Sequence, residues 1–151
     1  MLVTTAHFNN LVLTQLSNPA TGGTAGPLVG TSMFLFTQAP ALHPSMKLTD
    51  FTECLFTGYA RKALTWGDVL MEADGSGKLL SNLADFRATG TAITEVVTGY
   101  GVIDAATPTP NVLFAEMFPS PVNVTGVGEG ISVVGEMGYE GSDGGGATFV
   151  I

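Results

Sequence analysis

The chain has 151 residues, of which 45% are hydrophobic and 12% are charged, and its formal net charge at pH 7 is −8. A domain of this length buries roughly 70% of the surface that its unfolded chain exposes, so it can fold without a metal ion or a disulfide. Its 5 Lys and Arg residues are scattered among 13 acidic residues, which argues against a nucleic-acid partner because phosphate binding requires clustered cations.

Residues 1–27 are expected to form an arm. Apolar residues recur within segment 6–16 at spacings that place them on one face of a short helix. These candidate partner-binding residues are Phe8, Leu11, Val12 and Leu16. Segment 18–27 is rich in Gly, Pro and small residues, as is typical of a flexible linker. Because an isolated helix of about a dozen residues is marginal in water, this one must pack on its own domain or, as we favour, on a neighbouring subunit.

Residues 28–151 are predicted to form one β domain. Short apolar runs alternate there with turn residues, a spacing that is typical of an antiparallel β-sandwich or barrel. The runs span residues 31–37, 51–59, 63–72, 85–89, 93–104, 112–118, 121–127, 131–137 and 147–151. The run 93–104 is apolar on both alternating faces, which predicts a central strand covered on both sides. The expected fold class is therefore mostly β, with a short N-terminal helix.

Two Gly-rich segments predict turns. The sequence Asp74-Gly75-Ser76-Gly77 is expected to form a hairpin turn, because Gly readily adopts the positive φ of a tight reversal. The segment 141–146 is expected to form a mobile surface loop before the last strand.

Signals for secretion or membrane insertion are weak. The first residues lack the basic and apolar regions of a signal peptide, and no stretch approaches the roughly 20 apolar residues of a membrane span. We therefore expect a soluble protein that is made in a cytoplasm and has no membrane partner.

Residues that support catalysis or metal binding are few. The histidines are His7 and His43 and the single cysteine is Cys54, a set too small and too widely spaced for a zinc site or a nucleophile with its base. Cys54 lies in an apolar run and is interpreted as a buried thiol. His43 is interpreted as a residue that caps a turn or is simply solvated. We expect no metal, no cofactor and no enzymatic activity.

Acidic and aromatic residues leave alternatives open. Glu95 and Glu116 are candidates for the paired carboxylates of a hydrolase, although strands commonly expose alternate acids. Trp66 and Tyr100 are interpreted as core residues, because each lies in a predicted strand among apolar neighbours. A module that binds a host glycan would instead expose aromatic faces such as those of Trp66, Tyr59 or Tyr100.

Three segments follow one another in a specific order. Residues 50–60 read Asp-Phe-Thr-Glu-Cys-Leu-Phe-Thr-Gly-Tyr-Ala, residues 98–104 read Thr-Gly-Tyr-Gly-Val-Ile-Asp, and residues 113–118 read Leu-Phe-Ala-Glu-Met-Phe. Together they resemble the D-F-T-E-x-x-F-x-G-Y-A, Y-G-Y-x-V-x-D and L-F-A-E-x-F pattern of a family of small tailed-bacteriophage virion structural proteins. The resemblance covers roughly residues 31–119. The chain departs from the pattern at Gly99 and in its Gly-rich C-terminal part.

This resemblance implies a structural protein of the virion, made in the host cytoplasm. We expect a capsid decoration or cement protein that binds the major capsid protein or other virion subunits. The low fraction of charged residues agrees with a surface that is partly covered by neighbours, and we expect a homo-oligomer, with a trimer favoured. The alternative is a tail- or fibre-associated module that binds a receptor or glycan.

Overall fold

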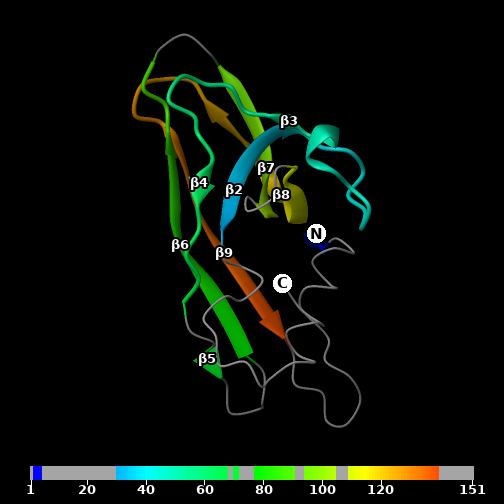
Figure 1. The fold of residues 1–151 in the computed structure, drawn as a ribbon. Coiled ribbons are helices and arrows are strands. Elements are labelled where there is room, and N and C mark those ends of the chain that lie inside the picture. Colours follow the sequence, from blue (N-terminus) through cyan, green and yellow to red (C-terminus); the bar gives the residue numbers. More distant parts are fainter. Residues whose placement is uncertain are drawn as a thin grey trace.

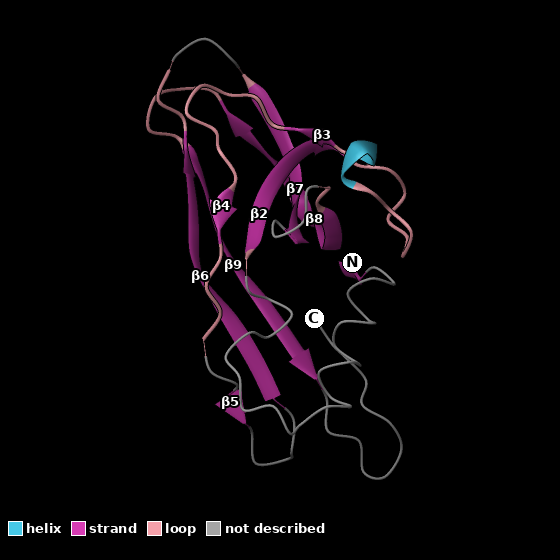
Figure 2. Cartoon of the chain, viewed as in Figure 1, coloured by secondary structure: helices cyan, strands magenta, loops and turns pink. Residues whose placement is uncertain are grey.

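The computed structural model describes residues 2–4, 30–67, 70–71, 77–90, 94–104 and 109–139. Within these ranges the chain is mostly β, as the sequence predicts (Figures 1 and 2). The elements are β1 (Leu2–Thr4), β2 (Thr31–Gln38), the 3-10 helix η1 (Leu48–Asp50), β3 (Thr52–Glu53), β4 (Lys62–Ala63), β5 (Leu70–Met71), β6 (Gly77–Arg87), β7 (Glu95–Asp104), β8 (Asn111–Val124) and β9 (Gly130–Tyr139). No helix in the described ranges is long and apolar enough to cross a membrane.

The strands form two antiparallel sheets. The large sheet has the order β1-β8-β7-β2-β3, and β4 also pairs with β2. The small sheet has the order β5-β6-β9. Figure 1 shows β6 and β9 running side by side as a long ladder that extends past the end of the large sheet. Neither sheet closes into a barrel over the part of the chain that the structure describes.

One hydrophobic core joins the two sheets. Its buried side chains come from β2, β7 and β8 of the large sheet and from β6 and β9 of the small sheet. On β6 the expected alternation is clear, because Ala84 and Phe86 are buried in this core while Leu83 and Arg87 are exposed. Cys54, Phe56 and Leu64, from the segment that links β3 to β5, complete the same core.

A second apolar cluster covers the other face of the large sheet. Phe34 and Phe36 of β2 and Ile103 of β7 pack there with Met46 and Phe51, which come from the segment that carries η1. Figure 2 shows η1 as the single cyan turn beside the end of β3. Both β2 and β7 are thus buried on two faces, which confirms the prediction of a covered central strand for residues 93–104.

Two glycines of β7 make room for the aromatic rings of this second cluster. Gly101 lies opposite Phe34, and Gly99 lies opposite Phe36. A Cβ atom at Gly101 would stand 2.4 Å from Cε1 of Phe34, and one at Gly99 would stand 2.6 Å from Cζ of Phe36. The rings therefore lie across β7 itself, and the departure of this chain from the family pattern at Gly99 falls at one of these contacts.

Two predicted strands are much shorter than expected. In the run 51–59 only Thr52–Glu53 pairs as a strand, because the chain turns at Gly58, whose φ is 94°. In the run 63–72 the pairing reduces to β4, β5 and an isolated bridge between Trp66 and Ser81. These segments fold around side-chain contacts instead of a continuous ladder.

Two other strands are longer than expected. The runs 112–118 and 121–127 belong to one strand, β8, whose ladder with β7 is interrupted between Met117 and Val122. Pro119 and Pro121 lie in that interruption, where no ladder hydrogen bond is required. Strand β6 begins at Gly77 and not at residue 85, and it includes a bulge at Ser81 and Asn82.

Several predictions fall wholly or partly outside the described residues. These are the helix 6–16 with Phe8, Leu11, Val12 and Leu16, the linker 18–27, the loop 141–146 and the strand 147–151. The predicted turn at 74–77 falls mostly outside them, but the register Met71↔Gly77 confirms a reversal between β5 and β6. The start of the predicted arm is described, and β1 pairs there with β8.

Candidate functional site

Glu53, Tyr59 and Arg61 form a hydrogen-bonded cluster around the turn at Gly58. The Tyr59 hydroxyl accepts a hydrogen bond from the Leu35 amide at 3.1 Å and donates one to Oε1 of Glu53 at 2.6 Å. The same carboxylate binds Arg61, with Nε at 2.9 Å from Oε1 and Nη2 at 2.7 Å from Oε2. The cluster thus connects the turn at Gly58 to the backbone of central strand β2.

The protonation states fit a structural role for this cluster. Burial raises the pKa of Glu53, but the hydrogen bonds from Arg61 and Tyr59 outweigh this effect and hold that pKa below its ordinary value. Burial and the bond to Glu53 raise the pKa of Tyr59 well above its ordinary value. At neutral pH both residues are fixed in one state, so this cluster is suited to hold the fold.

The predicted inert thiol is confirmed as buried. Cys54 is fully buried, and burial, reinforced by the charges of Glu95 and Glu53, raises its pKa to about 12. Its thiol therefore stays protonated at neutral pH. Because the thiolate is the nucleophilic form, Cys54 is unreactive in the folded chain.

The candidate acidic pair does not converge. The Glu95 carboxylate, at the start of β7, accepts hydrogen bonds from the amides of Leu55 at 2.8 Å and Phe56 at 3.1 Å. Glu116 instead accepts a hydrogen bond from the Tyr100 hydroxyl at 2.8 Å. Because Glu116 lies opposite Tyr100, five residues along β7 from Glu95, the two carboxylates are separated by roughly 17 Å of strand. They serve two different structural contacts.

The candidate aromatic platforms lie mostly against the core. Tyr100 is 7% exposed, in agreement with its predicted core position. Trp66 and Tyr59 are half-buried and pack against the core between the sheets. The Trp66 indole donates a hydrogen bond to Oγ1 of Thr31 at 3.0 Å, so its polar edge is used within the domain.

The remaining sequence candidates are structural or isolated. His43 is exposed, and its Nδ1 accepts a hydrogen bond from the Ser45 amide at 3.2 Å, so it caps a turn, which is one of the two alternatives that the sequence left open. Among the residues whose placement is described, no three His, Cys, Asp or Glu side chains come together as a possible metal site.

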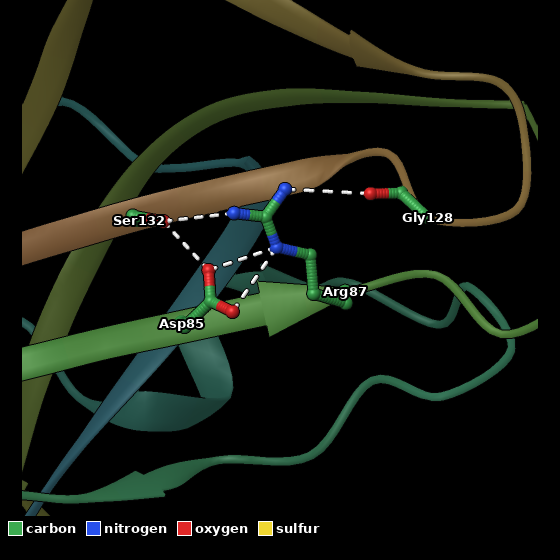
Figure 3. Close-up of polar contacts among 4 residues, drawn as sticks. All are labelled: Asp85, Arg87, Gly128 and Ser132. Atoms are coloured by element: carbon green, nitrogen blue, oxygen red, sulfur yellow. Dashed lines mark hydrogen bonds and ion pairs between the residues drawn. The ribbon is translucent and has the colours of Figure 1, made fainter.

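The exposed face of the small sheet carries the clearest ordered surface group. Arg87 of β6 donates from Nε to Asp85 at 2.9 Å and reaches across to β9, where Nη2 donates to Oγ of Ser132 at 3.3 Å (Figure 3). Its Nη1 donates to the Gly128 carbonyl at 3.3 Å, and Ser132 donates to Asp85 at 2.6 Å. The hydrogen bond from Arg87, followed by that from Ser132, lowers the pKa of Asp85. The guanidinium is thereby fixed over β9.

Apolar side chains continue this face along the same two strands. Leu83 is 58% exposed and Val134 is 44% exposed, and the two residues lie directly opposite each other. The exposed Glu136 follows two residues after Val134 on β9. We call the group Leu83, Asp85, Arg87, Ser132, Val134 and Glu136 the outer patch; it is the candidate interaction site.

The outer patch is not predicted by the sequence pattern, although one signal for it exists. The run Ile131-Ser132-Val133-Val134 contains two consecutive valines, and in a strand one of them must face outward. Leu83, the residue of β6 opposite Val134, is not predicted to lie in a strand, because the polar residues Ser81 and Asn82 precede it and interrupt the apolar pattern. The pairing of Leu83 with Val134 depends on a long-range register that periodicity alone does not contain.

An open, mostly apolar pocket of about 480 Å³ lies between residues 44–49 and 109–112, beside η1 and the start of β8. It contains no cluster of catalytic groups.

No protein-family model matches this chain, and no curated protein is significantly similar to it in sequence.

Proposed function

We propose that this protein is a structural subunit of a tailed-phage virion, a capsid decoration or cement protein with a two-layer β-sandwich fold. It binds the major capsid protein or other virion subunits through protein–protein contacts and stabilises the shell, without enzymatic activity or a cofactor. We further propose that it acts as a homo-oligomer, with a trimer favoured.

The observation that carries this proposal is that apolar side chains are exposed on ordered parts of the backbone. Leu83 and Val134 are exposed on the ladder of the small sheet, and Leu55, which is 73% exposed, is fixed by the bond from its amide to Glu95. Exposed apolar groups on an ordered scaffold are typical of protein-binding surfaces. A subunit that works by adhesion needs such surfaces and no reactive group.

The family motif supports the same proposal. Within the motif, Tyr59 bonds the backbone of β2 and Glu53, and Glu53 also binds Arg61 just after the motif, so these contacts support a role in the fold and not in catalysis. The arm residues Phe8, Leu11, Val12 and Leu16 remain the proposed contact with a neighbouring subunit.

The proposal is tested with shells of the virus that encodes this chain, prepared without it. Added protein should co-sediment with the shells, saturate at a stoichiometry set by the lattice, and raise the temperature at which the shells disrupt. In purified particles, quantitative mass spectrometry should give a copy number in proportion to the major capsid protein. A copy number that matches the tail, together with attachment to host cells, would instead establish the receptor-binding alternative.

A further inference from the structure

Strand β9 has one open edge in the part of the chain that the structure describes, where it pairs with β6 alone. The Gly135 amide donates to Oγ of Ser81 on β6, and the Glu129 carbonyl accepts from the Ala88 amide on that same side. Backbone groups of successive residues point to opposite sides of a strand. The amides and carbonyls of Ser132, Val134 and Glu136 therefore point away from β6, toward the open edge.

Within residues 130–136, this edge lacks the proline, lysine and bulge that commonly prevent strand pairing. Segment 130–136 contains no Pro and no Lys, and its single charged residue is Glu136. The bulge of the small sheet lies on β6, between Leu80 and Leu83, so β9 itself stays regular. An edge with these properties is a template for another strand.

We propose that β9 pairs antiparallel with β9 of a second copy of this chain, about a two-fold axis at Val134. The two small sheets then form one continuous sheet with the outer patches of both copies on the same face. This inference does not depend on the proposed function, because the contact needs no other virion protein.

The outer patch is self-complementary in this register. Val134 lies opposite the partner's Val134, and Ser132 lies opposite the partner's Glu136. Arg87 already reaches over Ser132 at 3.3 Å, so the partner's Glu136 arrives beside a guanidinium that is fixed in place (Figure 3). The two-fold axis repeats this ion pair on the other side of the two valines, which gives an apolar centre flanked by two opposite-charge contacts.

Registers with the two-fold axis at Glu136 or at Ser132 give a less favourable pairing than the axis at Val134. An axis at Glu136 would place two carboxylates directly opposite each other, and like charges in that position are destabilising. An axis at Ser132 would place Val134 opposite the partner's Gly130 and would move Glu136 beyond the start of the partner strand at that residue. Of these three registers, only the axis at Val134 pairs apolar with apolar groups and acid with base.

The contact joins copies in pairs. A two-fold contact is isologous and closes at two subunits, so it neither builds a fibre nor excludes a three-fold contact elsewhere on the surface. When the pair forms, the backbone groups at this edge of both β9 strands are hydrogen-bonded, so no further strand can add there.

Cross-linking of the full-length chain tests the register. In a hydrogen-bonded antiparallel pair the two Cα atoms lie roughly 5.5 Å apart, which is within the range of a disulfide. The variant Val134→Cys should therefore form a covalent dimer on mild oxidation. The matched control is Val127→Cys, because Val127 is 60% exposed but precedes β9. The native Cys54 is buried and does not compete.

Sedimentation of the full-length chain, without shells, tests the contact itself. Val134→Lys should halve the mass of the wild-type assembly, from a dimer to a monomer or, where the proposed three-fold contact also forms, from a hexamer to a trimer. Val127→Lys should leave that mass unchanged. Glu136→Lys should weaken dimerisation at least tenfold, about 1.4 kcal/mol. A wild-type monomer, a dimer that Val134→Lys leaves intact, or equal cross-linking of the two cysteine variants would overturn the proposal. A wild-type monomer that needs Val134 to bind shells would assign the edge to a shell subunit instead.

Discussion

At the scale of single residues, the close contact between the glycines of β7 and the aromatic rings of β2 leaves the least room for substitution. Gly101→Ala would place a Cβ atom 2.4 Å from the Phe34 ring, which is itself fully buried and held against Phe51. Overpacking of this kind costs about 1–3 kcal/mol. We expect Gly101→Ala to lower the free energy of unfolding by that amount in denaturant titration.

The control for this prediction is Gly67→Ala. The nearest heavy atom to a Cβ at Gly67 is the Leu80 carbonyl oxygen at 3.6 Å, which is an ordinary contact. This variant should unfold near the wild-type midpoint. Equal stability of the two alanine variants would show that β7 shifts freely under the rings and that the close approach is unimportant.

The ion pair between Glu53 and Arg61 predicts a pH dependence of stability. The folded-state pKa of Glu53 lies below its ordinary value of 4.5, so its contact contributes stability above that value and loses it as pH falls through the lowered pKa. We expect Glu53→Gln to be less stable than wild type at neutral pH. The difference should shrink in acid, as measured by denaturant titration at both pH values.

The matched variant for Glu53→Gln is Asp85→Asn. Asp85 also binds an arginine, but it lies on the exposed outer patch, where ion pairs contribute little. A large effect of Asp85→Asn on unfolding, with none for Glu53→Gln, would reverse the assignment of the two clusters.

Local residue type predicted the positions of several side chains. Burial of Cys54 and Tyr100 and the turn cap by His43 follow from their immediate neighbours in the sequence. The partners of Glu53 did not, because Arg61 and Tyr59 reach it only after the chain reverses at Gly58. Contacts made by a turn depend on its backbone path, which residue types alone leave open.

At the scale of elements, periodicity predicted the strands that cross the core and missed those held by side chains. Strands β2 and β7 match apolar runs because their residues are buried on both faces, and β9 matches one because buried residues alternate regularly with exposed ones. Strand β6 was mostly missed because Ser81, a buried polar residue, interrupts its apolar pattern. That serine is satisfied by Gly135 and Asn82, so a polar residue occupies a strand without penalty.

The N-terminal arm gives a prediction at this scale. Because β1 pairs with β8, deletion of the whole arm would also remove a strand of the large sheet. The cleaner variant is Leu11→Ser with Leu16→Ser, which keeps β1. We expect an unchanged unfolding midpoint and shell binding weakened at least tenfold, about 1.4 kcal/mol, in co-sedimentation.

The paired surface substitution Asn9→Ser with Asn10→Ser is the control for the arm, since neither residue belongs to the predicted apolar face. It should bind shells like wild type. Loss of folding in the leucine variant would place that face in the core of its own domain and reject the contact with a neighbour.

At the scale of the whole molecule, net charge and composition predict behaviour better than they predict architecture. With a formal net charge of −8, the protein should not bind DNA at physiological salt, as a mobility-shift titration would measure. A chelator should leave its thermal midpoint unchanged. DNA binding in the micromolar range, or a midpoint lowered by the chelator, would contradict these expectations.

The assignment of each strand to one of the two sheets was beyond the reach of the sequence. An apolar run predicts that a strand has a buried face, but it does not predict which strand pairs with it. The position of β8 between β1 and β7, and of β9 beside β6, depends on pairings between distant segments. The candidate interaction site depends on the same pairings, since the outer patch is built from two strands that only the fold brings together.

The position of β2 has a consequence for how the chain acquires its structure. Strand β2 pairs in the large sheet with β7, where Met33 lies opposite Val102. During synthesis this pairing cannot form until β7, which lies about 60 residues later in the sequence, has been made. Closing so long a loop before any contact forms is slow, and domains dominated by distant pairings fold in about milliseconds to seconds. During synthesis, the Phe34 and Phe36 rings can contact Met46 and Phe51 early but lack the cover of β7 until that strand leaves the ribosome, which makes that interval the time of greatest risk of aggregation.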